Sequence, residues 1–396
     1  MRALKWVAGR SLRLIPEPLR ARMLPGAFRF DASAPHPVPT ASPGDVRLLV
    51  APLNYAGQGW EWARALRTHS PGAWAMNMVV RTPNDFRHPA DLVVPLGVYA
   101  ASTRWQRAAF ASVADGFTHV MIEAEKQPFG ALLDETTTGQ ARRLRDRGVD
   151  VVMLCHGTDV RSPSRHRATE PESPFHDTMA AQAETLERIA EHNRRTLAEV
   201  AAPVLVSTPG LLDDVPEARW LPVVVDVERW QTSRPPRSDG RPVVAHAPSS
   251  SAVKGSEAID PVLLRLHEEG LIEYLRLSGV PYDEMPAAYQ SADIVVDQLR
   301  LGDYGVAACE AMAAGRVVVG HVSPATRAVV AERTGLPLPV VEADRSTLEG
   351  VIRGLVAEPQ SAATSAERGV AFVRAVHDGR MSAEILRDTL HEASAR

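Results

Sequence analysis

Short apolar runs alternate with helical segments along most of this 396-residue chain. Apolar runs bounded by turn residues are typical of strands that a parallel sheet buries on both faces, and helices usually connect such strands. The alternation therefore predicts an α/β protein with parallel sheets. The expected strands are 46–52, 75–80, 92–95, 119–122, 150–155, 204–207, 221–225, 242–246, 292–296 and 317–319. The expected helices include 60–67, 139–147, 176–200 and 382–393.

One segment interrupts the alternation. Residues 226–242 are rich in proline, glycine and charge, and they fit neither a strand nor a helix. A chain of this length is long enough to form two hydrophobic cores. We therefore expect two doubly wound, Rossmann-like domains over 45–228 and 240–376. A basic extension with a linker (1–44) precedes them, and a C-terminal helix (377–396) follows. The carboxyl edges of the two sheets should face each other across a cleft, where such folds bind ligands.

Charge and cysteine content exclude several classes of protein. The formal net charge of −4 argues against a general nucleic-acid-binding protein. No apolar run reaches the roughly 18 residues that a membrane span needs, and nothing resembles a secretory signal. Only Cys155 and Cys309 are present, so the expected compartment is a reducing cytoplasm. Both cysteines are expected to be small buried hydrophobes rather than reactive thiols.

The first 30 residues are basic and contain a single acid, Glu17. On a helix, one face would carry Leu4, Val7, Ala8, Leu14 and Ile15, and the opposite face Arg2, Lys5, Arg10 and Arg13. Such a helix fits two interpretations. It binds peripherally to an anionic membrane surface, at the inner face of the membrane, or it packs on its own domain.

The most informative motif is residues 297–322 (DQLRLGDYGVAACEAMAAGRVVVGHV), where a glycine turn precedes a short helix and an apolar strand. The turn ends at Gly305, and the helix covers 306–314. Free N–H groups at a helix start hold phosphate oxygens. Glu310 would lie near the same helix mouth, where a carboxylate accepts hydrogen bonds from both hydroxyls of a ribose. This motif predicts a nucleotide site, and the alternative is an ordinary βαβ connection with a solvated Glu310.

A glycine turn also follows the first strand. Residues 54–62 (NYAGQGWEW) carry Gly57 and Gly59 at the first two glycine positions of a dinucleotide fingerprint, but Trp62 occupies the third. A tryptophan there is too large for close helix–strand packing, which disfavours an NAD or FAD site. The turn would still let a substrate or phosphate approach the backbone, and the alternative is a plain connection.

A histidine lies at the end of another strand. His156 comes directly after the strand at 150–155. There it would donate to a substrate oxygen or exchange a proton, with Asp159 orienting it, and the alternative is a structural histidine. Glu123 and Glu125, which follow the preceding strand, are either acceptor contacts or surface acids.

Lysine is scarce, since only Lys5, Lys126 and Lys254 occur. Lys254, followed by Gly255, lies just before the first expected helix of the second half. A compact charge with three donors suits a diphosphate leaving group. The alternative is a solvated loop lysine.

These motifs carry a resemblance. A Lys-Gly pair before the first helix of the second domain, with G-x-x-x-x-E-A-M-A-x-G and a valine-rich strand, resembles retaining nucleotide-sugar glycosyltransferases of the GT-B fold, family four. The likeness covers residues 46–373. By this resemblance, Lys254 neutralises the donor diphosphate and Glu310 binds the donor ribose. The Gly57–Gly59 turn resembles the loop that faces donor phosphate and acceptor, and His156 resembles the histidine near the reacting sugar.

The resemblance implies transfer of a hexosyl group from a nucleoside diphosphate sugar to an acceptor hydroxyl with retention, the departing phosphate taking the acceptor proton. The catalytic residues would be His156, Lys254 and Glu310. Further donor contacts would be Gly57, Gly59, Ser249, Gly255, Asp303, Tyr304, Gly305 and Val306. Acceptor contacts would be Asn54, Gln58, Glu123 and Asp159. No D-x-D motif is present, so we expect that no metal and no cofactor is required.

Three positions depart from the family pattern. Gly302 stands where a second glutamate is usual, Ser249 where an arginine precedes the lysine, and Arg316 where a proline follows A-x-G. Two other functions therefore stay open beside the transferase. One is a catalytically inactive binding protein of this fold, and the other is a nucleotide-sugar epimerase of this fold.

Overall fold

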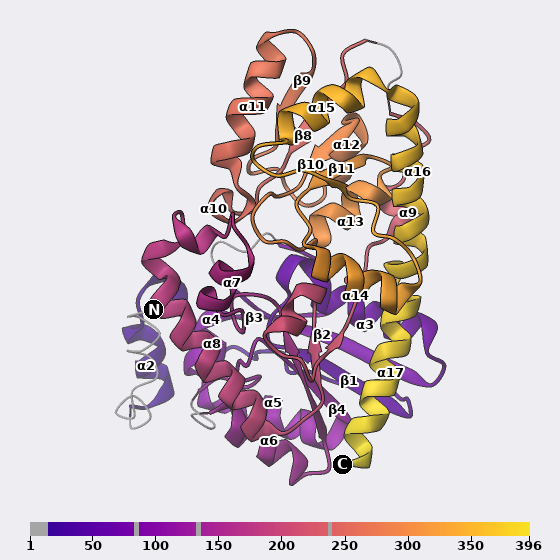
Figure 1. The fold of residues 1–396 in the computed structure, drawn as a ribbon. Coiled ribbons are helices and arrows are strands. Elements are labelled where there is room, and N and C mark those ends of the chain that lie inside the picture. Colours follow the sequence, from indigo (N-terminus) through magenta and orange to yellow (C-terminus); the bar gives the residue numbers. More distant parts are fainter. Residues whose placement is uncertain (1–14, 83–86, 132–135, 237–239) are drawn as a thin grey trace.

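The computed structural model describes residues 15–82, 87–131, 136–236 and 240–396. Two sheets organise these residues, one with the strand order β3-β2-β1-β4-β5-β6-β7 and one with the order β12-β11-β10-β8-β9. Every strand pair within these two sheets is parallel. In Figure 1 the five-stranded half stands above the seven-stranded half. The predicted α/β architecture with two Rossmann-like parallel sheets is confirmed.

The seven-stranded sheet comprises β1 (Val46–Ala51), β2 (Ala73–Arg81), β3 (Leu92–Pro95), β4 (His119–Glu123), β5 (Asp150–Cys155), β6 (Val204–Val206) and β7 (Arg219–Trp220). Its connections contain η3 (Tyr55–Gly57), α3 (Gln58–His69), α4 (Leu96–Ala101), α5 (Thr103–Gly116), α6 (Thr137–Arg145), α7 (Pro163–Thr169), η4 (Pro174–His176), α8 (Ala180–Val200) and η5 (Pro209–Asp213). The short helix α9 (Val227–Trp230) leads into the second half.

One expected strand is wrong, because the sheet ends with β7 and the N–H of Leu221, which donates to the carbonyl oxygen of Val206, whereas residues 222–225 leave the sheet. Pro222 has no N–H group to donate to a ladder. The N–H of Val224 instead donates to the side chain of Gln58, and the N–H of Val225 donates to the carbonyl oxygen of His377. These backbone groups connect α3 with the C-terminal segment rather than with a neighbouring strand.

The five-stranded sheet comprises β8 (Val243–His246), β9 (Glu273–Arg276), β10 (Ile294–Val296), β11 (Val317–Gly320) and β12 (Val341–Glu342). Its helices are α10 (Ser251–Lys254), α11 (Ser256–Glu268), α12 (Met285–Ser291), α13 (Val306–Ala313), α14 (Pro324–Thr334), α15 (Leu348–Ala357) and α16 (Pro359–Val376). The last helix, α17 (Arg380–Ala395), packs against α3 and β5 of the first half. Figure 1 shows α16 and α17 following one another down the same side of both halves.

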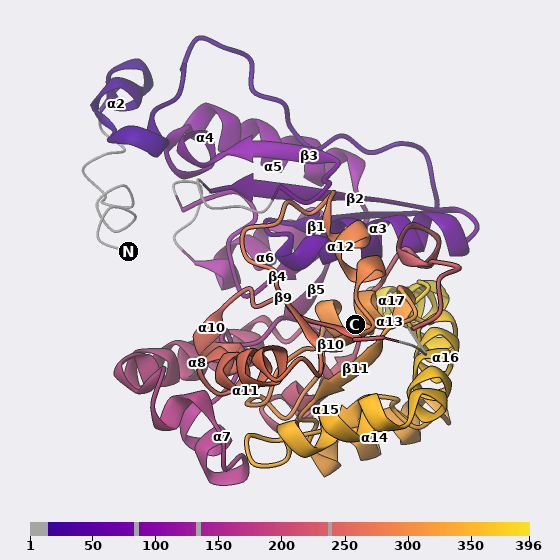
Figure 2. The ribbon, with the colours of Figure 1, turned by 90° about the horizontal axis from the view of Figure 1, so that it is seen from above.

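The described part of the basic extension packs on the first domain. In α2 (Glu17–Met23), Arg20 is 2% exposed and donates to Thr103 Oγ1 at 2.9 Å. Figure 2 shows the chain after α2 running past α4 and α5 before it enters β1. The amphipathic helix predicted before residue 15 lies outside the described residues. Within them, no helix is long and apolar enough to cross a membrane.

A buried arginine joins the two halves. Arg300, which follows β10, is 2% exposed and forms ion pairs with Asp177 of the first half and Glu257 of the second. Its Nε also donates to the carbonyl oxygen of Glu172 at 2.8 Å. Because these partners come from both halves, Arg300 helps to fix how the halves lie against each other.

Arg300→Met is expected to lower the free energy of unfolding by about 2 kcal/mol, because the carbonyl oxygens of Glu172 and Ser173 lose the buried guanidinium that donates to them. Urea denaturation measures the change. Arg345→Met is the matched control: Arg345 pairs with Glu172 and Glu257 but is half-exposed, so its loss should cost less than about 1 kcal/mol. Equal effects of the two substitutions would contradict the role given to Arg300.

Candidate functional site

Two cavities lie between the halves, beside the carboxyl ends of the strands. The Glu310 cavity has a volume of about 440 Å³, and its lining includes Tyr55, Ser249, Lys254, Tyr282, Val306 and Glu310. The His156 cavity has a volume of about 430 Å³, and its lining includes Tyr55, Gln58, Lys126, His156, Asp159 and Val306. Because Tyr55 and Val306 border both, the two cavities meet at these residues. A third, smaller cavity of about 250 Å³ is bordered by His156, Lys254, Asp303 and Tyr304.

The N-terminus of α13 opens at this meeting point. Gly305 and Val306 border the His156 cavity, and Val306 and Ala307 border the Glu310 cavity. A Cβ added to Gly305 would meet nothing within 4 Å, so a ligand has room to approach the backbone there. The N–H groups of a first helical turn have no partners within the helix, and here they are available to phosphate oxygens.

Glu310 lies in a largely apolar part of its cavity. Met285 and Tyr289 border the same space. Burial raises the pKa of Glu310 to about 8, and the Arg229 guanidinium opposes this rise. Protonated Glu310 therefore predominates at neutral pH. An acid whose pKa is raised and that borders a cavity is typical of a functional group, which favours a ligand contact over a solvated helix carboxylate.

Lys254 ends α10 and borders both the Glu310 cavity and the third cavity. Its ammonium forms an ion pair with Asp297 at the end of β10, and little of either side chain is exposed. The alternative of a solvated loop lysine is therefore wrong. Gly255 serves packing, because its φ is +82° and a Cβ there would lie 2.9 Å from Arg300 Cγ.

A buried carboxylate holds the ring of His156. His156 Nε2 lies 3.2 Å from Glu123 Oε1, and Glu123 also accepts a hydrogen bond from the N–H of Leu53 at 3.0 Å. Asp159 accepts the backbone N–H of His156 at 2.8 Å, so it fixes the main chain rather than the ring. The Tyr55 ring meets the imidazole edge-on, with centroids 5.0 Å apart. The expectation of surface acids after β4 is wrong, since Glu123 is 0% exposed.

Two predicted acceptor contacts, Asn54 and Gln58, form hydrogen bonds with the backbone near the site. Asn54 Oδ1 accepts the N–H of Trp60 at 3.1 Å and so fixes the start of α3. Gln58 exchanges two hydrogen bonds with the backbone of Val224, at 3.0 and 2.7 Å. Of these two residues, only Gln58 borders the His156 cavity.

The glycine turn before α3 serves close packing. Gly57 adopts a φ of +77°, and a Cβ on Gly59 would lie 2.6 Å from Asn77 Nδ2. Neither glycine borders the two larger cavities, whereas Tyr55 and Ala56 of the same turn border both. The part of this turn that is available to a ligand is therefore its first two residues.

Asp303 and Tyr304 point away from the Glu310 cavity. Asp303 is buried, pairs with Arg161 at 3.4 Å, and would collide with a side chain at Gly210. The Tyr304 ring lies in an aromatic cluster that includes His377. Both residues border only the third cavity, so neither contacts the space beside Glu310.

Gly302, where the family glutamate would stand, could take a side chain only if Glu170 moved and the backbone were strained. Its φ is +62°, and a Cβ would overlap the carboxylate of Glu170. Glu170 pairs with His321 at 2.8 Å, and His321 also pairs with Glu342 at 2.6 Å. Hydrogen bonds to these two carboxylates raise the pKa of His321 to about 9. The backbone at Gly302 is thus shaped for contact between the halves.

The structure adds residues that sequence patterns do not identify. Tyr282 borders the Glu310 cavity, and the guanidinium carbon of Arg229 lies 4.2 Å from its ring centroid. Tyr55 borders both larger cavities. Tyr282 follows the short strand β9, whose exposed charged ends give no apolar signal, and Arg229 comes from the segment between the domains.

Three potential metal ligands come together among the described residues. Ligand atoms of Glu125, Cys155 and Asp159 lie within 4.8 Å of one another. Burial raises the pKa of the Cys155 thiol well above its usual value, and Cys155 Sγ donates to Glu125 Oε1 at 3.3 Å. A protonated thiol is a poor ligand. That no metal is required therefore stays a prediction.

Glu125→Gln is expected to remove a pH dependence of stability. Burial raises the pKa of Glu125 to about 8, whereas an unfolded glutamate titrates near 4.3. The folded protein binds the extra proton between these values and loses stability as the pH rises through that window. Between pH 5 and pH 9 the wild type should lose on the order of 3 kcal/mol more than the variant. Chemical denaturation at both pH values tests this, and parallel losses would show that Glu125 ionises freely.

No protein-family model matches the chain, and no curated protein matches it in sequence. Solved structures superpose on nearly its whole length. Sucrose-phosphate synthase from Thermosynechococcus elongatus has a TM-score of 0.56 at 14% identity, covering 88% of this chain and 99% of that one. The catalytic domain of starch synthase IV from Arabidopsis thaliana, bound to ADP and acarbose, has a TM-score of 0.55 at 10% sequence identity. The match covers 90% of this chain and 100% of that one. HepE of Anabaena in complex with UDP has a TM-score of 0.53 at 14% sequence identity, and the match covers 88% of this chain and 100% of that one.

These neighbours are GT-B glycosyltransferases, and their two parallel-sheet α/β domains correspond to the two halves of this chain. The chain therefore has the GT-B fold that the sequence motifs predicted.

Proposed function

We propose that the protein transfers a hexosyl group from a nucleoside diphosphate sugar to an acceptor hydroxyl, with retention of configuration. One observation carries the proposal: Lys254 and Glu310, from different elements, border a single cavity that also takes in the start of α13. HepE has been solved with UDP and with UDP-glucose, which supports a nucleotide sugar as the partner.

In the proposed donor complex, each part of the nucleotide has a chemical counterpart. The Glu310 carboxylate accepts hydrogen bonds from the two ribose hydroxyls. The Lys254 ammonium and the N–H groups at the start of α13 bind the diphosphate. Tyr282, whose ring Arg229 and His88 contact, borders the same cavity and adds apolar surface that suits a nucleobase.

In the transfer step, the bond from the anomeric carbon to the diphosphate oxygen breaks and a bond to the acceptor oxygen forms on the same face. The acceptor proton goes to the departing phosphate oxygen, so no separate protein base takes part. Lys254 stabilises the charge that develops on the diphosphate. His156 lies where the His156 cavity meets the third cavity. Glu123 holds its Nε2, and its other ring nitrogen forms a hydrogen bond with a hydroxyl of the transferred sugar.

The proposed function is tested by incubating the protein with UDP, GDP, dTDP and ADP sugars and an acceptor panel. The expected result is that one nucleotide series raises the melting temperature and that NMR shows the donor's anomeric configuration in the product. An inactive binding protein would bind the donor without transfer or hydrolysis. An epimerase would interconvert the free nucleotide sugar without an acceptor. If no nucleotide sugar binds, the donor site is refuted.

A further inference from the structure

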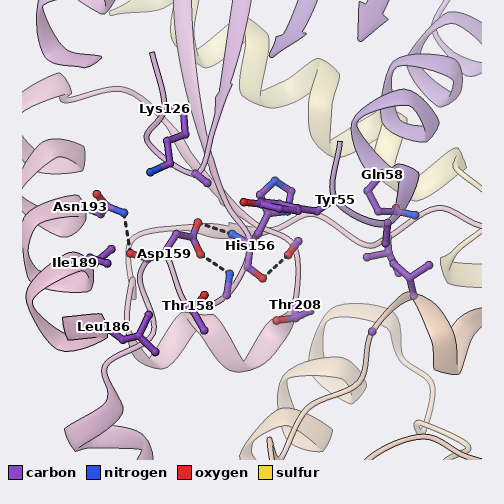
Figure 3. Close-up of a pocket in the computed structure, with 17 residues that line it drawn as sticks. Tyr55, Gln58, Lys126, His156, Thr158, Asp159, Leu186, Ile189, Asn193 and Thr208 are labelled. Atoms are coloured by element: carbon purple, nitrogen blue, oxygen red, sulfur yellow. Dashed lines mark hydrogen bonds between the residues drawn. The ribbon is translucent and has the colours of Figure 1, made fainter. Parts of the chain in front are cut away.

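A lysine at the rim of the His156 cavity is not held in any hydrogen bond or ion pair among the described residues. Lys126 is exposed, and its ammonium forms no hydrogen bond or ion pair there. Ala124 and Glu125, with φ values of +47° and +52°, turn the chain at the end of β4 and place Lys126 at the cavity. Figure 3 shows Lys126 above Asp159 and beside the space that Asn193 borders.

Two acids at this end of the cavity, Glu125 and Asp159, bond to other protein groups instead of pairing with Lys126. Glu125 is 6% exposed and accepts a hydrogen bond from the thiol of Cys155, and it forms no ion pair with Lys126. Asp159 accepts the backbone N–H groups of His156 and Gly157 and forms no ion pair with Lys126. An unpaired cation at a concave rim with low-dielectric walls attracts an anion.

The remaining lining favours an apolar body rather than a polyol. Leu186 and Ile189 of α8 form one side of the cavity, as Figure 3 shows. Several polar side chains of the lining are already bonded to protein groups. Asn193 Nδ2 donates to the carbonyl oxygen of Asp159 at 2.9 Å, and the Gln58 amide is bonded to the backbone. Thr208 Oγ1, which has no hydrogen-bond partner among the described residues, can bind one hydroxyl, but the several hydroxyls of a sugar would lie against Leu186 and Ile189 without the partners that buried hydroxyls need.

Resting on the proposed function, we infer that the acceptor is a compact hydroxyl compound with an apolar body and an anionic group, and that Lys126 binds the anion. The body would lie against Leu186 and Ile189, and the hydroxyl would reach Val306, where the cavity meets the Glu310 cavity. A volume of about 430 Å³ suits a small molecule of this kind. Carboxylate and phosphate share this chemistry.

The test uses probes that share a phenol ring and differ in the group opposite the hydroxyl. Binding of 4-hydroxybenzoate, 4-hydroxyphenyl phosphate and the neutral 4-hydroxybenzamide to the full chain is measured by NMR titration without donor. We expect one of the anions to bind about tenfold more tightly than the amide, as a charge-assisted hydrogen bond would give. Which anion binds more tightly distinguishes a carboxylate from a phosphate acceptor.

Variants assign the preference to Lys126. Lys126→Met should abolish it and Lys126→Arg should keep it. Arg188→Met, which removes an exposed cation of α8 outside the lining, should also keep it. Equal binding of anion and amide by the wild type, no binding of either, or a preference that survives Lys126→Met overturns the inference. Nucleotide binding is measured separately for each protein, so failure of the donor site is recognised independently.

Discussion

The double variant Lys254→Met, Asp297→Asn should lower kcat for sugar transfer by about a hundredfold to a thousandfold. Lys254 is the lysine that borders the Glu310 cavity beside the start of α13. Negative charge on the diphosphate grows as the sugar leaves, so the ammonium binds the transition state more strongly than the ground state. Steady-state kinetics at saturating donor measures the loss as kcat rather than as binding.

The second substitution, Asp297→Asn, limits the loss of stability, so that the variants are compared by activity. Lys254→Met alone would leave the Asp297 carboxylate buried without its partner, which costs about 3–5 kcal/mol of stability. Asp297→Asn alone retains the lysine and is the matched control, expected to keep most of kcat. If the double variant turns over at the rate of this control, Lys254 does not stabilise the leaving group.

Glu310→Gln should weaken binding of a ribonucleoside diphosphate by about tenfold or more, because the amide cannot accept both ribose hydroxyls as a carboxylate does. The 2′-deoxyribonucleotide provides the matched probe. Wild-type protein should prefer ribose, and the variant should bind both nucleotides alike. Isothermal titration calorimetry on the four pairs of protein and nucleotide gives the coupling free energy between Glu310 and the 2′-hydroxyl. Independent, additive losses would contradict a contact between Glu310 and the ribose.

The same carboxylate should give donor binding a characteristic pH dependence. Since burial raises the pKa of Glu310 to about 8, the empty protein must release a proton there before the carboxylate can accept two hydroxyls. Binding should therefore strengthen as the pH rises through 8, and Glu310→Gln should remove this change. Affinity that is flat with pH in the wild type would show that the acid is already ionised.

Much of the fold could be predicted because parallel strands are buried on both faces. Such strands appear as apolar runs, and β3 and β5 have the expected bounds. The strand ends then indicate where a site can lie, which is how His156 and Lys254 are found. The strand β9 is not predicted by this pattern, because its ends, Glu273 and Arg276, are exposed and charged.

The contacts that shape the site depend on residues far apart in the sequence. Glu123 holds the ring of His156 because β4 and β5 are neighbours in the sheet, which no local pattern encodes. Gly302 is a close-packing position because Glu170 of the other half meets it. Local spacing therefore finds candidate groups, whereas burial and partners decide which of them border a cavity.

The most direct test of the proposed donor site is a structure of the protein with the nucleoside diphosphate that raises its melting temperature most. The ribose hydroxyls should lie on Glu310, and the diphosphate should lie between Lys254 and the first turn of α13. A nucleotide bound away from this cavity, or one whose phosphates lie far from Lys254, would contradict the proposed function.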